Sequence, residues 1–355
     1  MGGVCYWNMN RKLFRLLFLL SFTFVFSCRN AFVEGLNPST EALDLNSCLY
    51  YLSRASGAKG ISRYCNHSGS EIVIPNENII EFDLASISNR IVYLIRANGN
   101  DEIWMAEISG NGKEKVHSCL DEKCGNVVVS PDGSSVYFSQ MSEQAALLMV
   151  DISNDSLKTI SNIAVDWIDI SPDGSYLRFH ERQSGYLRIL STNDYAHKFS
   201  IPADIDLIGE WSSDYRKFVI GERNAQGILN VTAYSEISAE KLGKEELFNL
   251  SQGLQYYNPI FASENTFFVL MRGGLKDNTK QIVKIDRHGD QLSLISRTAF
   301  YDHSSLQWNE RDGILAFQQF DPTSSESVPQ IATWDQKSGD ISVIAQNAVQ
   351  PQWLN

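Results

Sequence analysis

Five arginines stand at matching points of a repeated segment, each at the end of a strand-like stretch. They are Arg54, Arg96, Arg182, Arg223 and Arg272. If these stretches belong to successive units of a ring, five guanidinium groups lie on one face, where they suit carboxylate or phosphate groups. A structural interpretation stays open beside this one, in which each arginine pairs with an Asp or Glu of its own or the next unit.

A second set of candidate binding residues combines aromatic and acidic side chains. It comprises Asp166, Trp167, Asp206, Tyr256, Tyr257, Asp302 and His303. All of them come shortly before or early in predicted innermost strands, so we expect them on the same face as the arginines. Exposed aromatic groups beside acids suit a protein or peptide partner. The alternative is that they line a central channel.

No motif of the chain indicates catalysis. The six histidines are scattered, and neither a His-Glu-x-x-His, a Gly-x-Ser-x-Gly nor a Walker sequence is present. Asp166 and Asp169 share one predicted strand, and we expect turn and channel roles for them rather than an acid–base pair. We therefore predict no catalytic residues, no metal and no cofactor. An enzyme that assembles its site from dispersed residues stays the alternative.

The elements that must position these residues follow from a repeat. Ser-Pro-Asp-Gly occurs at residues 130–133 and 171–174, and Pro-Asp-Gly favours a tight turn. Degenerate copies near Leu84, Trp211, Phe261 and Trp308 bring the frames to six, spaced about 41 to 50 residues apart. Further strand-like segments follow the frames, and four strands per unit are typical of a β-propeller blade. The best helical candidate, residues 238–248, is expected to be a short excursion inside a blade.

These frames resemble the TolB-like (WD40-like) propeller repeat over roughly residues 47 to 355. The resemblance implies a periplasmic, non-catalytic propeller that docks an envelope protein or peptide on one face or in its channel. It also implies that arginines after the second strand are often structural. Two alternatives remain: a sensory domain related to membrane-anchored winged-helix transcription regulators, and a lactonase- or cyclase-like propeller enzyme.

The two ends of the chain predict how the ring closes. Residues 47–78 read as a blade that lacks its first strand, and residues 349–353 match the lead-in to Trp211 and Trp308. We predict an all-β propeller of four-stranded blades, with seven blades favoured over six. The C-terminal strand is expected to be innermost in the blade that contains residues 49–54. Such pairing removes an open sheet edge.

The first 28 residues have the features of an export signal. A basic stretch from Met9 to Arg15 precedes an apolar stretch from Leu16 to Ser27. Cys28 follows a sequence that resembles a bacterial lipoprotein cleavage box, with an uncleaved anchor or a soluble secreted product as alternatives. Residues 29–46 read as a linker to a propeller domain at 47–355, which is predicted to be periplasmic, tethered to the membrane and monomeric.

Four cysteines lie beyond the leader and allow three disulfide connectivities. In the blade model Cys48 and Cys65 lie at facing ends of a hairpin, and Cys119 and Cys124 close a short loop. Export favours these two disulfides over free thiols. The formal net charge of −12 argues against nucleic acid and anionic lipid as partners.

Overall fold

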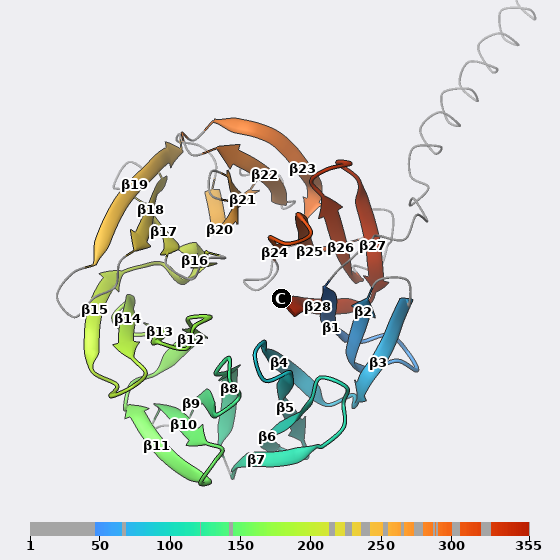
Figure 1. The fold of residues 1–355 in the computed structure, drawn as a ribbon, viewed down its shortest axis with the longest axis vertical. Coiled ribbons are helices and arrows are strands. Elements are labelled where there is room, and N and C mark those ends of the chain that lie inside the picture. Colours follow the sequence, from blue (N-terminus) through green and yellow to red (C-terminus); the bar gives the residue numbers. More distant parts are fainter. Residues whose placement is uncertain are drawn as a thin grey trace, which may run out of the picture. The chain divides into compact units, whose positions relative to one another are not determined.

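The computed structural model describes residues 47–65, 69–120, 122–141, 145–212, 217–223, 229–235, 242–250, 255–263, 266–272, 280–286, 288, 290–299, 306–320 and 328–354. These residues form antiparallel strands around a central axis, and their one short 3-10 helix is η2 (Ile205–Leu207) (Figure 1). No helix among them is long and apolar enough to cross a membrane. The predicted leader, with Cys28, and the predicted linker 29–46 lie outside the described residues.

Each blade contains four strands, numbered here from the axis outward. Blades 1 to 3 contain β4 (Ile79–Ala85), β5 (Arg90–Ala97), β6 (Asn100–Glu107), β7 (Glu114–Cys119); β8 (Lys123–Val129), β9 (Ser135–Met141), β10 (Ala146–Asp151), β11 (Ser156–Ser161); and β12 (Val165–Ile170), β13 (Tyr176–Glu181), β14 (Tyr186–Ser191), β15 (His197–Pro202). Blades 4 and 5 contain β16 (Ile208–Trp211), β17 (Lys217–Arg223), β18 (Leu229–Ser235), β19 (Gly243–Leu250); and β20 (Gln255–Ser263), β21 (Thr266–Arg272), β22 (Lys280–Asp286), β23 (Gln291–Ala299). Blades 6 and 7 contain β24 (Leu306–Asn309), β25 (Ile314–Phe320), β26 (Pro329–Asp335), β27 (Ile341–Gln346); and β28 (Ala348–Leu354), β1 (Cys48–Ser53), β2 (Gly60–Cys65), β3 (Gly69–Pro75).

The described strands make six hydrogen-bonded sheets, and one of these sheets has eight strands. Blades 5 and 6 together make up the eight-stranded sheet, and their single joining pair is Ala299 with Gln319. Seven clusters of buried apolar side chains lie between consecutive blades, one at each junction around the ring. The ring therefore has six sheets by hydrogen bonding and seven four-stranded blades by packing.

Ring closure occurs as predicted. The C-terminal strand β28 pairs antiparallel with β1, and Leu49 lies opposite Trp353. The side chain of Asn347 also donates to the Arg54 carbonyl oxygen at 3.0 Å. In Figure 1 the C-terminus lies at the centre of the ring, where β28 meets the axis. The blade that holds the first described strand is thus completed by the last one.

Irregular pairing recurs at the same places in the blades. Register shifts interrupt the pairing of the third and fourth strands in all seven blades. Bulges of this kind protect exposed sheet edges from pairing with other chains. Similar shifts interrupt the pairing of the innermost strand in every blade except blade 6.

One expectation about local structure is wrong. Residues 243–248, predicted to be helical, belong to the outermost strand β19. The charged residues Lys244, Glu245 and Glu246 are all exposed there. An outermost strand of a blade is largely exposed to solvent. Its sequence therefore lacks the alternation of apolar and polar residues that identifies a half-buried strand.

Both predicted disulfides are present. The Cys48 and Cys65 Cα atoms are 4.4 Å apart, and the bond joins β1 to β2 in the closing blade. The bond between Cys119 and Cys124, with Cα atoms 6.2 Å apart, joins β7 of blade 1 to β8 of blade 2. One disulfide thus braces the N-terminal hairpin of the closing blade, and the other braces a junction between blades.

Candidate functional site

The two faces of the ring differ in what they expose. On the entry face, as we call it, the innermost strands begin and the second strands end. The turn face lies opposite and carries the two Ser-Pro-Asp-Gly turns. Those turns are internally satisfied: Asp132 accepts from the Ser130 hydroxyl at 2.6 Å, and Asp173 accepts from the Ser171 hydroxyl at 2.5 Å. The turn-face aspartates are therefore structural.

The predicted arginine positions lie on the entry face. The backbone N–H groups of Arg54, Arg96 and Arg182 donate to the carbonyl oxygens that immediately precede the innermost strands, at 2.7, 2.9 and 3.0 Å. Arg223 and Arg272 end β17 and β21, and Arg272 pairs with the first residue of β20. The side chains of these last two residues lie outside the described part of the structure.

Arg96 has a structural role. Its guanidinium makes two hydrogen bonds of 2.7 Å to the carboxylate of Asp101, which is only 1% exposed. A third bond of 3.3 Å reaches the carbonyl oxygen of Cys124. Burial alone would raise the pKa of Asp101, but the hydrogen bonds from Arg96 and from the Cys124 amide keep it below its usual value. The pair therefore anchors the disulfide-linked segment between blades 1 and 2.

Arg54 and Arg182 are held more loosely. Arg54 Nη1 is 3.5 Å from the carbonyl oxygen of Glu77. Arg182 Nε is 4.0 Å from Asp166 Oδ2, and the Arg182 side chain is 55% exposed. Loose, solvated ion pairs contribute little to stability. Among the arginines of this set whose side chains the structure describes, these two are held less firmly than Arg96.

Asp166 lies in a small polar cluster near the start of β12. The nearly buried ring of His180 contacts it, with 2.7 Å between Nδ1 and Oδ1. The other ring nitrogen is 3.1 Å from the carbonyl oxygen of Ala203, in the linker that leads to β16. Asp206 lies further along that linker, in η2. The structure thus brings together Asp166 and the linker of Asp206 through a histidine that sequence reasoning had not assigned to a site.

The other predicted aromatic and acidic residues have different outcomes. Trp167 lies in β12 beside the fully buried Arg178, whose guanidinium carbon is 5.2 Å from the centre of the indole ring. Tyr256 and Tyr257 lie in β20 opposite Met271 and Leu270. The positions of these tyrosine side chains, and all of Asp302 and His303, lie outside the described residues.

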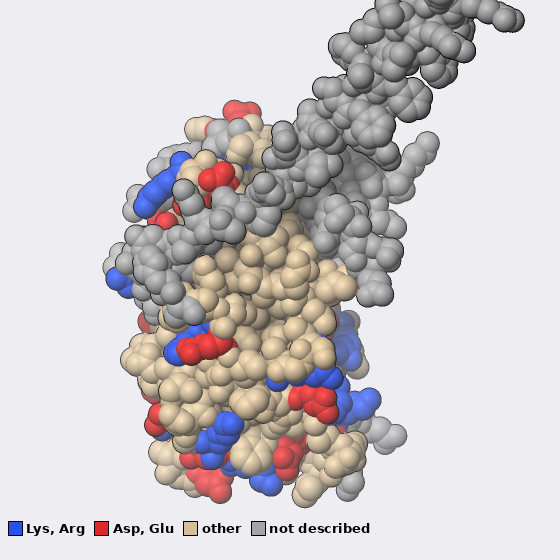
Figure 2. Space-filling view, turned by 90° about the vertical axis from the view of Figure 1, so that its right-hand side faces the viewer, with Lys and Arg blue, Asp and Glu red and all other residues tan. Residues whose placement is uncertain are grey.

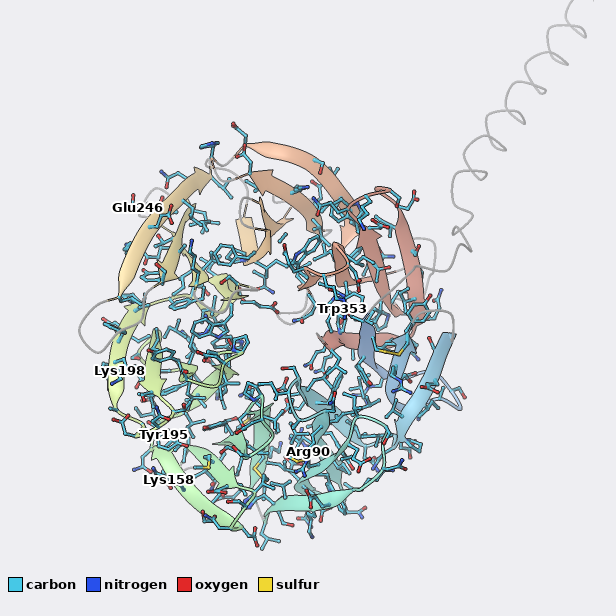
Figure 3. All side chains as sticks on the ribbon, in the orientation of Figure 1. Arg90, Lys158, Tyr195, Lys198, Glu246 and Trp353 are labelled. Carbon is cyan, nitrogen blue, oxygen red and sulfur yellow. A yellow bond between two sulfur atoms is a disulfide. The ribbon has the colours of Figure 1, made fainter. Side chains whose placement is uncertain are left out.

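A layer of polar side chains around the axis was not predicted as a set. We call it the axial layer, and it consists of Asp83, Asp169, Glu210, Gln307 and Gln352. Each of these residues lies in an innermost strand, and the residue that follows it pairs with a fully buried apolar residue of the second strand. These pairs are Leu84 with Ile91, Ile170 with Leu177, Trp211 with Phe218, Trp308 with Leu315, and Trp353 with Leu49. Figure 3 shows Trp353 beside the centre, whereas Lys198 and Glu246 lie at the rim.

Contacts between non-neighbouring blades show that the axial layer faces the axis. The Gln307 amide donates to Glu210, although blade 5 separates their strands. Burial raises the pKa of Glu210 to about 8, and the negative charge of Asp169 adds to this effect. Burial likewise raises the pKa of Asp83 to about 7, although its carboxylate accepts a backbone hydrogen bond from Val129. The axis of the ring is therefore a poorly solvated environment for carboxylates.

Carboxylates also join blade 1 to blade 2. Glu81 accepts from the Val127 amide at 2.8 Å, and Asp83 accepts from the Val129 amide at 2.9 Å. Glu81 and Asp83 are two residues apart on β4, and the amides that they accept from are two residues apart on β8. The two carboxylates therefore accept the hydrogen bonds that a neighbouring strand would otherwise accept. Burial raises the pKa of Glu81 to about 7. The innermost edge of blade 2 is satisfied in this way without a backbone partner.

One guanidinium group lies between the axial layer and an aromatic cage. Arg178 is fully buried and donates to Asp169 and to the Gly209 carbonyl oxygen. Its guanidinium carbon is 4.3 Å from the centre of the Trp211 ring and 4.7 Å from that of Phe218. Such stacking stabilises a desolvated cation. Arg178 thus balances part of the negative charge around the axis and joins blade 3 to blade 4.

A signal for the axial layer exists in the sequence. Three of its members stand directly before a tryptophan, in the dipeptides 210–211, 307–308 and 352–353. The tryptophans mark the end of the innermost strand, so the preceding residue must point to the other side of it, toward the axis. Among the described residues, no group of three His, Cys, Asp or Glu side chains has the arrangement of a metal site.

Comparison with known proteins supports the fold. No family model matches the chain, and no curated protein matches its sequence. The structure is similar to TolB from Acinetobacter baumannii, with a TM-score of 0.54 and 11% identity over 88% of this chain and 67% of that one. It is similar to the periplasmic gluconolactonase PpgL of Pseudomonas aeruginosa, with a TM-score of 0.55 and 12% identity over 87% and 99% of the two chains. A protein from Lactobacillus plantarum gives a TM-score of 0.57 at 11% identity over the same shares. At these identities the likeness shows a propeller fold, shared with TolB and with enzymes.

Proposed function

We propose that the chain is a non-catalytic docking propeller of the bacterial cell envelope that binds a protein or peptide partner on its entry face. The observation that carries this proposal is the contrast between the faces. The turn-face aspartates accept hydrogen bonds within their own turns, whereas the contacts that Arg54 and Arg182 make with other described residues are long. Arg182, Asp166 and Trp167 place charge and an aromatic ring near one junction of the entry face.

Two further observations support an envelope location. The two disulfides suit an oxidising compartment. The similar structures include TolB and a periplasmic lactonase. On the side of the ring seen in Figure 2, basic and acidic side chains are interspersed, without an extended basic area of the kind that nucleic acids require.

The proposal is tested by photo-crosslinking in intact cells. A crosslinking amino acid at position 182 should yield a discrete adduct, which mass spectrometry identifies. The matched control is position 90, because Arg90 is also a partly exposed arginine, with a side chain that is 40% exposed, and it begins β5 on the turn face. Equal labelling from both positions, or none from 182, would show that the entry face is not the docking surface.

A propeller enzyme is the second candidate, and the axial layer favours it. Carboxyl groups whose pKa is raised toward neutrality are suited to general acid–base catalysis. Hydrolysis of a panel of lactones by the purified protein, with Glu210→Gln as the control, tests this candidate. Turnover that the variant abolishes would favour the enzyme over the docking propeller.

A further inference from the structure

His180 makes two contacts that a neutral imidazole ring cannot satisfy together. Its Nδ1 faces a carboxylate oxygen of Asp166 at 2.7 Å, and its Nε2 faces the carbonyl oxygen of Ala203 at 3.1 Å. A carboxylate and a carbonyl both accept hydrogen bonds, whereas a neutral imidazole donates from one nitrogen only. The Asp166–His180 pair must therefore hold one extra proton for both contacts to be hydrogen bonds.

The ring has little access to water that could replace a lost partner. His180 is 5% exposed, so an unsatisfied nitrogen remains against the protein. The charged residues from the surrounding segments are Asp166 on β12, Glu181 and Arg182 around the end of β13, Arg188 on β14, and Asp204 and Asp206 in the linker. Glu181 accepts from Arg188 at 2.7 Å, and Arg182 Nε lies 4.0 Å from Asp166 Oδ2.

The two contacts join different parts of the ring. Asp166 belongs to the innermost strand of blade 3, and Ala203 opens the linker to blade 4. The linker is also held by backbone bonds, from the Ala203 amide to Gly185 at 3.0 Å and from the Leu207 amide to Asp204 at 2.8 Å. In addition, the Leu207 side chain is buried in the core between blades 4 and 5. The histidine is thus a cross-brace between an inner strand and the next inter-blade connection.

We propose that His180 and Asp166 form a proton-dependent latch that fixes the linker 203–207 on the entry face. When the pair releases its proton to solvent, the remaining N–H donates to Asp166, because a charge-assisted hydrogen bond is the stronger one. Nε2 then presents a lone pair to the Ala203 oxygen, two acceptors face each other, and the linker loosens. Histidine side chains in general change charge between pH 5 and 8, and the measurements below span that range. This inference concerns the protein alone and does not depend on the proposed partner.

Amide hydrogen exchange tests the latch directly. Protection factors, corrected for the intrinsic effect of pH, should fall about tenfold between pH 6 and pH 8.5 at Ala203, Asp206 and Leu207, which corresponds to about 1.4 kcal/mol. His180→Gln should remove this pH dependence, because an amide side chain does not titrate. The control is His197→Gln in the same blade, whose exposed ring contacts Ser200 at 2.8 Å, and it should behave like the wild type.

A second measurement remains available if His180→Gln does not fold. Ring nitrogen chemical shifts of His180 in the wild-type protein should show both nitrogens protonated at low pH, and their midpoint should coincide with the loss of linker protection. Protection that is independent of pH in the wild type, or a histidine midpoint that differs from the exchange midpoint, would overturn the latch.

Discussion

Replacing Glu210 by Gln should stabilise the protein in alkaline solution and leave it unchanged in acid. Burial and the charge of Asp169 raise the pKa of Glu210 from 4.5 to about 8. A carboxyl group with a raised pKa favours folding at low pH, and that stability is lost as the pH rises from the unfolded pKa through the folded one. Gln resembles the protonated form, and its amide oxygen can still accept from Gln307.

The size of the effect follows from the shift. A change of about 3.5 pKa units corresponds to at most about 5 kcal/mol, since one unit is worth about 1.36 kcal/mol. Partial access to water and the charge of nearby Arg178 reduce this value, so we expect a gain of about 2 kcal/mol at pH 8.5. At pH 5 the expected difference is close to zero.

Urea unfolding followed by tryptophan fluorescence at pH 5 and pH 8.5 measures both quantities. Glu114→Gln is the matched control, because this glutamate is 55% exposed and lies 3.6 Å from Arg90 at the surface. An equal loss of stability in Glu210→Gln at both pH values would refute the reasoning. It would mean that Glu210 is an ionised partner of Arg178 throughout this range.

Three further predictions concern stability. Replacing Cys48 and Cys65 by Ser should cost about 3 kcal/mol, because a disulfide across this separation restricts the unfolded chain; peptide mapping without reduction would contradict this if it found free thiols in the wild type. Arg96→Gln should cost about 2 kcal/mol by leaving a buried carboxylate without its charged partner, whereas Arg182→Gln should barely change the melting temperature; equal losses would refute the distinction. Gly209→Ala should prevent stable folding, because the added Cβ would lie 2.0 Å from the carbonyl oxygen of Pro259 on the neighbouring blade; a melting temperature near that of the wild type would disprove this contact.

Much of the fold could be predicted because the relevant signals are local. The turns at residues 130–133 and 171–174 are specified by Pro, Asp and Gly themselves, and their spacing specifies the blades. The disulfides could be predicted from local positions as well, because Cys48 and Cys65 lie at the open ends of one hairpin. Ring closure could be predicted because the C-terminal residues repeat the lead-in to Trp211 and Trp308.

The axial layer and the latch could not be predicted in the same way. Gln307 meets Glu210 only because the ring brings strands of non-neighbouring blades to one axis. Bulges in the innermost strands change which residues face the axis. The position of a residue relative to the turn therefore does not identify the axis-facing residue in several blades. The contact of His180 with Ala203 depends on the path of a linker that has no repeat signal. For Arg96, the sequence left open a ligand or a structural partner, and only the buried Asp101 decides between them.

The way the ring closes has a consequence for how the protein forms. Asn347 reaches Arg54 across 293 residues of chain, and the pairing of β28 with β1 joins equally distant segments. Contacts of such sequence separation form slowly, since the loop must first be closed against its entropy. While the C-terminal segment is still being synthesised, β1 has no innermost neighbour, and its open edge can capture another extended strand. A chain cut short before Ala348 would retain that open edge permanently, so we expect truncated copies to misassemble rather than to remain as partial rings.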